Sequence, residues 1–150
     1  MKKIIGSLLL VSAAFVLLSS RTAEPPATYS LTVKVFHLRN STGTLQFTLY
    51  NKDGTIPDEK FKKYYRQQTA EINSHSSYVT FKNLPKGKYA VNILHDENEN
   101  GKIDKGWIMP IEGIGFTNFS SIGFSNRPNF KKASFYLGSN TTKTVKVIYM

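Results

Sequence analysis

The chain is constrained most by a two-residue alternation of apolar and polar side chains in short segments. Seven segments fit this pattern or are rich in β-forming residues: 29–35, 45–49, 78–81, 88–95, 107–109, 130–137 and 142–149. Alternation of this kind is typical of strands with one buried face, and Asn, Gly, Ser and Pro residues separate the segments. Because no strand–helix–strand rhythm is present, the pattern predicts an all-β fold, an antiparallel β-sandwich of about seven strands.

One stretch, 57–72, does not alternate. Its large apolar side chains recur at spacings nearer to 3.6 residues, and Pro57 suits the first turn of a helix. We therefore expect a short helical or irregular insertion here. Its basic and aromatic residues are Lys60, Phe61, Lys62, Lys63, Tyr64, Tyr65 and Arg66. They predict an amphipathic cover with inward aromatic rings, and the alternative is a patch for an anionic surface.

The N-terminus has the composition of an export signal. Lys2 and Lys3 precede the apolar run 4–18, and small polar residues follow. The run is short for a membrane span of about 20 residues, although a retained anchor is the alternative. We expect a signal peptide at 1–23, a Pro-containing linker at 24–28 and one domain at 29–150. No later apolar run predicts a transmembrane span, so we expect an exported protein of the periplasm, cell envelope or extracellular space.

Composition removes several classes of site. The chain has no cysteine, which excludes disulfides, thiolate zinc sites, iron–sulfur clusters and a cysteine nucleophile. The formal net charge is +10, but expected export argues against nucleic acid as the natural partner. No P-loop, Gly-x-Ser-x-Gly or His-Glu-x-x-His motif is present. We therefore expect a non-enzymatic protein.

One loop carries a chemical pattern, with acidic or amide side chains at alternate positions. Counted as a calcium loop, it supplies Asp96, Asn98 and Asn100, and then Gly101 for a sharp turn. The next candidate ligands are the backbone carbonyl of Lys102 and the side chain of Asp104. Calcium takes six to eight oxygen ligands, and alternate residues on a curled backbone can converge on one ion. The pattern predicts a Ca²⁺ site, whereas an acidic turn without metal is the alternative.

Charge and ligand count refine this prediction. Four of the ten acidic residues lie within 96–104, where they repel one another unless a cation is present. The twelfth loop position is Trp107, which cannot ligate, and Glu112 is the nearest later carboxylate. A site without the usual bidentate ligand should be weak, with a dissociation constant of roughly 10⁻⁴–10⁻³ M. Magnesium suits the loop less well because it uses fewer protein ligands.

Other candidate residues support weaker hypotheses. Trp107 is either a core residue or a stacking surface for sugars, which makes a carbohydrate- or cell-surface-binding module one alternative function. A hydrolase using Glu112 and Asp104, or His95, is another. His37, His75 and His95 are the only histidines, and their spacing does not require them to share a metal ion.

Three motifs in order resemble the bacterial DUF2141 family over about residues 30–149. They are Leu84-Pro85-Lys86-Gly87-Lys88-Tyr89-Ala90-Val91, the loop 95–104 followed by Pro110-Ile111-Glu112-Gly113-Ile114-Gly115-Phe116, and Pro128-Asn129-Phe130-Lys131-Lys132-Ala133-Ser134-Phe135. The chain departs from the family pattern at 107–109, and Thr117 stands where the family usually has Ser. The resemblance implies an exported, uncharacterised domain similar to prealbumin-like or Cna-B-like sandwiches, and it implies no reaction. A glycan or cell-envelope component is the partner we expect.

Overall fold

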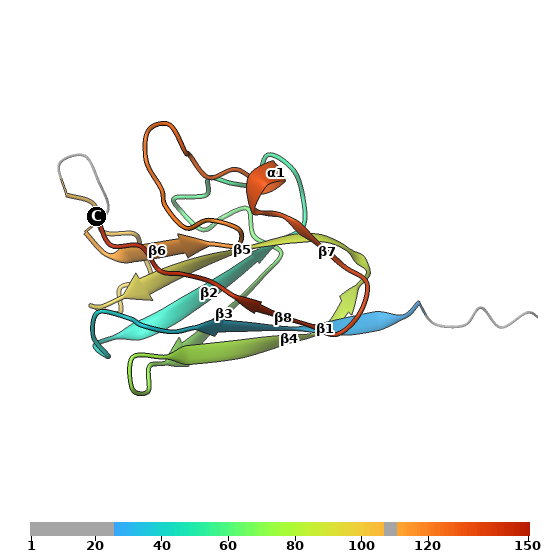
Figure 1. The fold of residues 1–150 in the computed structure, drawn as a ribbon, viewed down its shortest axis with the longest axis horizontal. Helices are drawn as coiled ribbons and strands as arrows, with labels where there is room; N and C mark the ends of the chain where they lie inside the picture. Colours follow the sequence, from blue (N-terminus) through green and yellow to red (C-terminus); the bar gives the residue numbers. More distant parts are fainter. Residues whose placement is uncertain (1–25, 107–110) are drawn as a thin grey trace, which may run out of the picture.

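Two β-sheets packed face to face form the domain in the computed structural model, which describes residues 26–106 and 111–150 (Figure 1). The elements are β1 (Thr28–Val35), β2 (Thr44–Tyr50), β3 (Arg66–Glu71), β4 (Ser77–Pro85), β5 (Gly87–Asp96), β6 (Gly113–Phe116), α1 (Phe130–Ala133), β7 (Phe135–Leu137) and β8 (Thr141–Thr144). The predicted all-β sandwich is confirmed.

The two sheets have different sizes and pairings. The smaller has the order β4-β1-β8, in which β1 is antiparallel to β4 and parallel to β8. The larger has the order β3-β2-β5-β6, with every pair antiparallel. Strand β7 adds to the beginning of β5, where Leu137 pairs with Gly87. The single parallel pair makes the smaller sheet mixed.

The predicted alternation accounts for the core between the sheets. Every second residue of the two long N-terminal strands is completely buried: Leu31, Val33 and Val35 in β1, and Leu45, Phe47 and Leu49 in β2. Tyr89, Val91 and Ile93 of β5 join them. The intervening residues point away from this core, because successive strand side chains lie on opposite faces.

A second apolar cluster covers the outer face of the larger sheet. It contains Tyr50, Ala90, Leu94, Ile114 and Phe116 from the strands, and Ile56, Phe119, Phe130 and Ala133 from the connections. Strand β5 is therefore buried on both faces, which explains why it reads as an almost continuous apolar run. In Figure 1 the connections that cover this sheet lie above it, with α1 among them.

The region 57–72 differs in part from expectation. Of the two predicted forms, helical or irregular, the first part of the region is irregular. Residues 66–71, however, form strand β3. This edge strand is polar on both faces, so no alternation marks it. Phe61 packs on the second cluster, whereas Tyr64 and Tyr65 are exposed. The predicted cover therefore turns only one of its three rings inward.

Two other strand predictions need correction at the C-terminal end. Within 130–137, the first four residues form α1, because the side chain of Asn129 accepts the Lys132 N–H at 3.0 Å and caps a helical turn. Only β7 follows it. The predicted strand 142–149 is β8 as far as Thr144, and beyond it only an isolated bridge joins Ile148 to Ile114. Strand β6, half of which is glycine, was not among the predicted strands.

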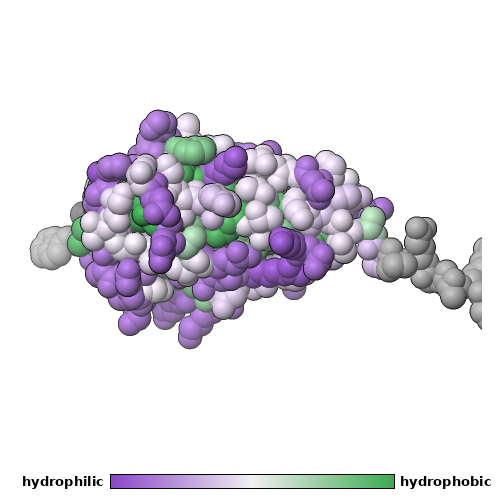
Figure 2. Space-filling view, turned by 90° about the horizontal axis from the view of Figure 1, so that it is seen from below, coloured by the Kyte–Doolittle hydropathy of each residue, from purple (hydrophilic) through white to green (hydrophobic). Residues whose placement is uncertain are grey.

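Some predictions fall on residues that the structure does not describe. The signal peptide 1–23, part of the linker 24–28 and the strand 107–109 lie outside the described residues. Across the described ranges, no helix is long and apolar enough to cross a membrane. Figure 2 shows the molecule from below, where hydrophobic residues form small separate patches among hydrophilic ones. No broad apolar surface covers that face.

Candidate metal-binding loop

The loop that carries the calcium pattern leaves β5 at Asp96 and runs toward β6. Asp96 pairs with Thr44, so the loop begins beside the start of β2. Gly43 makes this close approach possible. A Cβ on Gly43 would overlap the carbonyl oxygen of Asp96, and its φ of +71° is in the left-handed region. A glycine in another strand connection therefore shapes the entrance to the loop.

The Asp96 carboxylate folds the loop back on itself. Its Oδ1 accepts the N–H of Asn100 at 3.1 Å, and its Oδ2 accepts the N–H of Gly101 at 2.7 Å. Gly101 has a φ of +70°, as expected for the sharp turn predicted there. Asp96 is only 3% exposed. The side chain at the first position of the pattern is thus buried and directed into the curl.

The next three predicted ligands form one hydrogen-bonded group. Asn98 Nδ2 donates to Asp104 Oδ2 at 2.5 Å, and Asn100 Nδ2 donates to Asp104 Oδ1 and Oδ2 at 3.0 and 3.1 Å. Asn98 Oδ1 accepts the N–H of Asn100 at 3.1 Å, alongside Asp96 Oδ1. Asp96, Asn98, Asn100 and Asp104 therefore face a common centre within the loop.

Glu112 closes this group from the far side of the loop. Its Oε1 accepts the N–H of Glu97 at 3.1 Å, and its Oε2 accepts the N–H of Asp104 at 3.1 Å. The residue is 3% exposed. Burial raises the pKa of Glu112 above its ordinary value, the two N–H donors oppose this, and the charges of Asp96 and Asp104 raise it further. Three carboxylates thus lie close enough to repel one another.

Lys102 contributes to the curl through its backbone. Its N–H donates to Asn100 Oδ1 at 2.8 Å, and the residue is exposed. The next residue, Ile103, packs partly on the second apolar cluster. The loop is therefore anchored at its hydrophobic position, while its polar positions face the common centre.

The donor set fits a hard cation in kind, because carboxylate and amide oxygens are ligands that calcium prefers. In the present arrangement, however, the nitrogens of both asparagine amides face Asp104, and their oxygens accept backbone N–H groups. In 26–106 and 111–150 no group of three or more His, Cys, Asp or Glu side chains is placed to hold a metal. The loop brings the predicted residues together without a complete ligand sphere.

Glu97 points away from the common centre and ties the loop to another connection. It is ion-paired with Arg39, whose Nε donates to Oε1 at 2.8 Å, and Asn40 Nδ2 donates to Oε1 at 2.7 Å. The hydrogen bond from Arg39 is the main cause that lowers the pKa of Glu97 to about 2, against a smaller effect of burial. The sequence singled out neither Arg39 nor Asn40, because both lie far from the loop along the chain.

His95 is a buried structural residue. Its Nε2 lies 2.9 Å from the carbonyl oxygen of Thr42, and its Nδ1 lies 2.7 Å from Tyr149 Oη. A carbonyl oxygen only accepts, so Nε2 carries a hydrogen, and in the neutral ring Nδ1 accepts from the tyrosine. Tyr149 Oη in turn accepts the N–H of Arg39 at 3.2 Å. His75 Nδ1 lies 2.8 Å from the Leu38 carbonyl oxygen, so these two histidines have separate partners.

The other hypotheses receive no geometric support from the described residues. Glu112 is buried on two backbone donors, and Asp104 is engaged by two asparagines. Neither residue lines the cavity on the outer face of the larger sheet. Trp107, on which the sugar-binding alternative depends, lies outside the described residues.

Comparison with known proteins gives one match. A family model described as "Uncharacterized protein conserved in bacteria (DUF2141)" matches residues 33–146. The matched range begins within β1 and ends after β8, so it includes both sheets and the whole loop. No curated protein and no solved structure matches the chain.

Proposed function

The chain belongs to the DUF2141 family of bacterial proteins, and from that premise we propose that it is an exported, non-enzymatic β-sandwich module whose loop 96–104 binds calcium. Asp96, Asn98, Asn100, Asp104 and the backbone carbonyl of Lys102 would be the ligands, together with Glu112. Bound calcium would order the connection between β5 and β6, for use in binding or as a structural element.

The single observation that carries this proposal is the common centre of the predicted ligands. The Asp104 carboxylate accepts hydrogen bonds from the side-chain amides of Asn98 and Asn100. The Asp96 carboxylate accepts the backbone N–H of Asn100. Glu112 also bonds to this loop, although it lies five residues beyond the twelfth position, where a calcium loop usually has its last carboxylate. An acidic turn without metal, the alternative, would not need the buried Glu112 carboxylate, which lies just before β6, to hold its two ends.

Electrostatics supports the same conclusion. The domain has a large excess of basic residues, yet the Glu112 carboxylate lies close enough to Asp96 and Asp104 for their charges to raise its pKa. Two of them, Asp96 and Glu112, are almost fully buried. Burying carboxylates close together is unfavourable, and a divalent cation removes the repulsion. Rotation of the two asparagine amides would turn their oxygens toward the ion and would break the hydrogen bonds that these oxygens accept from the N–H groups of Asn100 and Lys102.

The proposed export is supported by the N-terminal composition, in which two lysines precede an apolar run. Extracellular calcium concentrations suit a weak site of this class, with a dissociation constant of roughly 10⁻⁴–10⁻³ M. Fractionation of cells that express the full chain tests this part, and recovery of the uncleaved chain in the cytoplasm would contradict export.

Thermal and urea unfolding of the full domain test the calcium site. At calcium about 100 times the dissociation constant, binding to the folded state alone stabilises it by about 2.7 kcal/mol relative to chelator. Asp104→Ala should abolish this gain, whereas Asp53→Ala, in an exposed turn, should retain it. Magnesium at the same concentration should give a smaller effect. Equal stability in calcium and chelator for the unmodified chain would refute the proposal.

A further inference from the structure

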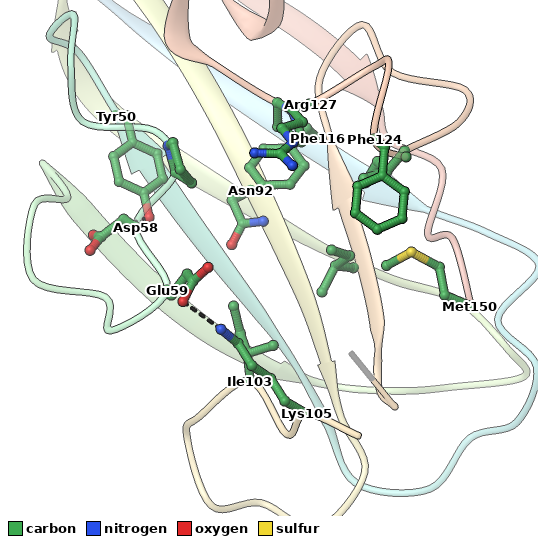
Figure 3. A pocket seen from close by; sticks show the side chains of 15 residues that line it. Tyr50, Asp58, Glu59, Asn92, Ile103, Lys105, Phe116, Phe124, Arg127 and Met150 are labelled. Carbon is green, nitrogen blue, oxygen red and sulfur yellow. Dashed lines mark hydrogen bonds and ion pairs between the residues drawn. The ribbon is translucent and has the colours of Figure 1, made fainter. Parts of the chain in front are cut away.

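A cavity of about 350 Å³ lies on the outer face of the larger sheet, and Ile103 and Lys105 of the loop side are among the residues that line it. Strands β2, β5 and β6 form its floor, and segments near Asp58 and Phe124 form its sides (Figure 3). Its volume is within the range of small-molecule sites, which are usually apolar with a few polar groups. None of the proposed calcium ligands lines it.

The floor of the cavity contains a buried amide with an unused acceptor. Asn92 is 3% exposed, and its Nδ2 donates to the Gly115 carbonyl oxygen at 3.2 Å. No donor from the described residues reaches its Oδ1. In Figure 3 this oxygen points away from β6 and into the space beside Glu59. Because this oxygen opens onto the cavity and accepts from none of the described residues, a ligand can donate a hydrogen bond to it and gain affinity.

Apolar side chains surround this acceptor. Phe116 belongs to the second apolar cluster, and Ile103 and Ile122 pack against it. Phe124 lines the same cavity although 74% of its surface is exposed. A large aromatic side chain this exposed at the rim of a cavity offers a surface for the apolar body of a ligand.

Two carboxylates and two cations line the cavity: Asp58, Glu59, Lys105 and Arg127. Glu59 and Lys105 neutralise each other across the opening at 2.5 Å. Asp58 accepts from Tyr50 Oη at 3.3 Å and from the backbone N–H groups of Lys62 and Lys63. Arg127 also lines the cavity, with its guanidinium 5.8 Å from the Phe124 ring centre.

Arg127 forms no ion pair with any described residue. Arg127 is therefore the cation at this rim with which a ligand can pair, and a guanidinium suits a carboxylate.

We propose that this cavity is a binding site for a small organic acid, whose carboxylate pairs with Arg127, whose apolar body packs on Phe124, and whose hydroxyl donates to Asn92. A sugar fits less well because most of the lining side chains are apolar. A cationic ligand fits less well because both carboxylates at the rim are already engaged.

Three related probes separate the parts of this proposal. They are 3-(4-hydroxyphenyl)propionate, 3-phenylpropionate, which lacks the donor, and 4-(3-hydroxypropyl)phenol, which lacks the charge. Amide chemical shifts of the full domain, followed during titration, report both affinity and location. The first probe should bind most tightly, and loss of either group should weaken binding by about tenfold, the effect of about one hydrogen bond to a charged or buried partner. The titrations are run in calcium and in chelator, so that failure of the loop site does not obscure the cavity.

Two variants test the location. Arg127→Gln should remove the tenfold preference for the acid over the neutral phenol, whereas Lys131→Gln, which removes an exposed charge outside the cavity, should not. Gly123→Phe should block binding of all three probes, because Gly123 lines the cavity and a Cβ there meets no atom within 4 Å. Gly87→Phe, at the beginning of β5, is the matched control.

Binding that follows this order and responds to these variants supports the site. Absence of shifts at millimolar concentration for all three probes would overturn it. Equal affinity of the acid for the unmodified domain and for both Arg127→Gln and Gly123→Phe would do the same.

Discussion

Glu112 Oε2 accepts the backbone N–H of Asp104 at 3.1 Å, so a carboxylate at the start of the segment leading into β6 holds the far end of the loop that follows β5. Its other oxygen holds the near end, through the N–H of Glu97. One buried side chain therefore joins both ends of the loop. This relationship explains how the loop stays closed although Trp107 occupies the position where a calcium loop usually has its last carboxylate.

Replacement of Glu112 should destabilise the domain even without metal. Glu112→Ala leaves the N–H groups of Glu97 and Asp104 without an acceptor, and each unsatisfied buried group costs about 1–3 kcal/mol. Glu112→Gln retains one acceptor oxygen and should lose less. Urea denaturation in chelator measures both variants. Glu99→Ala, at an exposed position of the same loop, should change stability by less than ~0.5 kcal/mol; a similar loss there would contradict the assigned role of Glu112.

Acid should weaken the link between Glu97 and Arg39. The pKa of Glu97 is lowered to about 2 in the folded domain, mainly by the hydrogen bond from Arg39, so the folded state binds its proton less tightly than the unfolded state. Stability from this carboxylate is therefore fully present above its ordinary pKa near 4.5 and is lost as the pH falls toward 2.

The difference in unfolding free energy between the unmodified chain and Glu97→Gln measures this effect. It should be constant near neutral pH and should shrink as the pH falls from about 4.5 to about 2. In an Arg39→Gln background the same comparison should lose most of its pH dependence, because Arg39 is the main cause of the lowered pKa. A difference that stays constant down to pH ~2 would show that the ion pair does not stabilise the fold.

Local pattern was sufficient to predict the strands whose two faces differ. In β1 and β2 the apolar side chains face the other sheet at every second position. The pattern failed in two strands whose side chains do not alternate between apolar and polar. Strand β3 is a polar edge strand, and β6 consists half of glycine, so neither alternates. The helical turn α1 depends on a cap from Asn129, which is too short a signal to interrupt a run that otherwise resembles a strand.

The contacts of the loop were likewise predictable in part. Asp96, Asn98, Asn100 and Asp104 are close in sequence, so their spacing was enough to predict that they would face one centre. Glu112 could be predicted as the next available carboxylate. Arg39 and Tyr149 could not, because they reach the loop only through the pairing of distant segments. The calcium ion itself stays a prediction.

Gly115 should not tolerate even one added carbon. A Cβ at this position would lie 2.5 Å from the carbonyl oxygen of Lys146 and 3.1 Å from Val145 Cγ1. Because the oxygen belongs to the backbone of the C-terminal segment, relief requires that segment to move away from β6. Gly115→Ala should therefore lower the free energy of unfolding by about 1–3 kcal/mol.

Gly123→Ala is the matched control for this substitution. A Cβ on Gly123 meets no atom within 4 Å, so its effect should be small or slightly stabilising, within about 1 kcal/mol. Urea denaturation of the two variants side by side provides the comparison. Equal losses would indicate that the close contact of Gly115 with the C-terminal segment does not matter for stability.

The hydroxyl of Tyr149 should be the main link between the C-terminal segment and the loop side of the sandwich. It donates to His95 Nδ1 at 2.7 Å and accepts the Arg39 N–H at 3.2 Å. Tyr149→Phe removes one atom, leaves the buried His95 nitrogen without a donor, and should cost about 1–3 kcal/mol of unfolding free energy. Tyr136→Phe removes the same atom from a side chain in a residue that is 64% exposed, and should cost less than ~0.5 kcal/mol. Amide hydrogen exchange should locate the Tyr149 effect, with faster exchange at Ile114 and Ile148, which bond each other across the same junction. Equal stability and unchanged exchange in Tyr149→Phe would mean that the C-terminal segment is held by its apolar contacts alone.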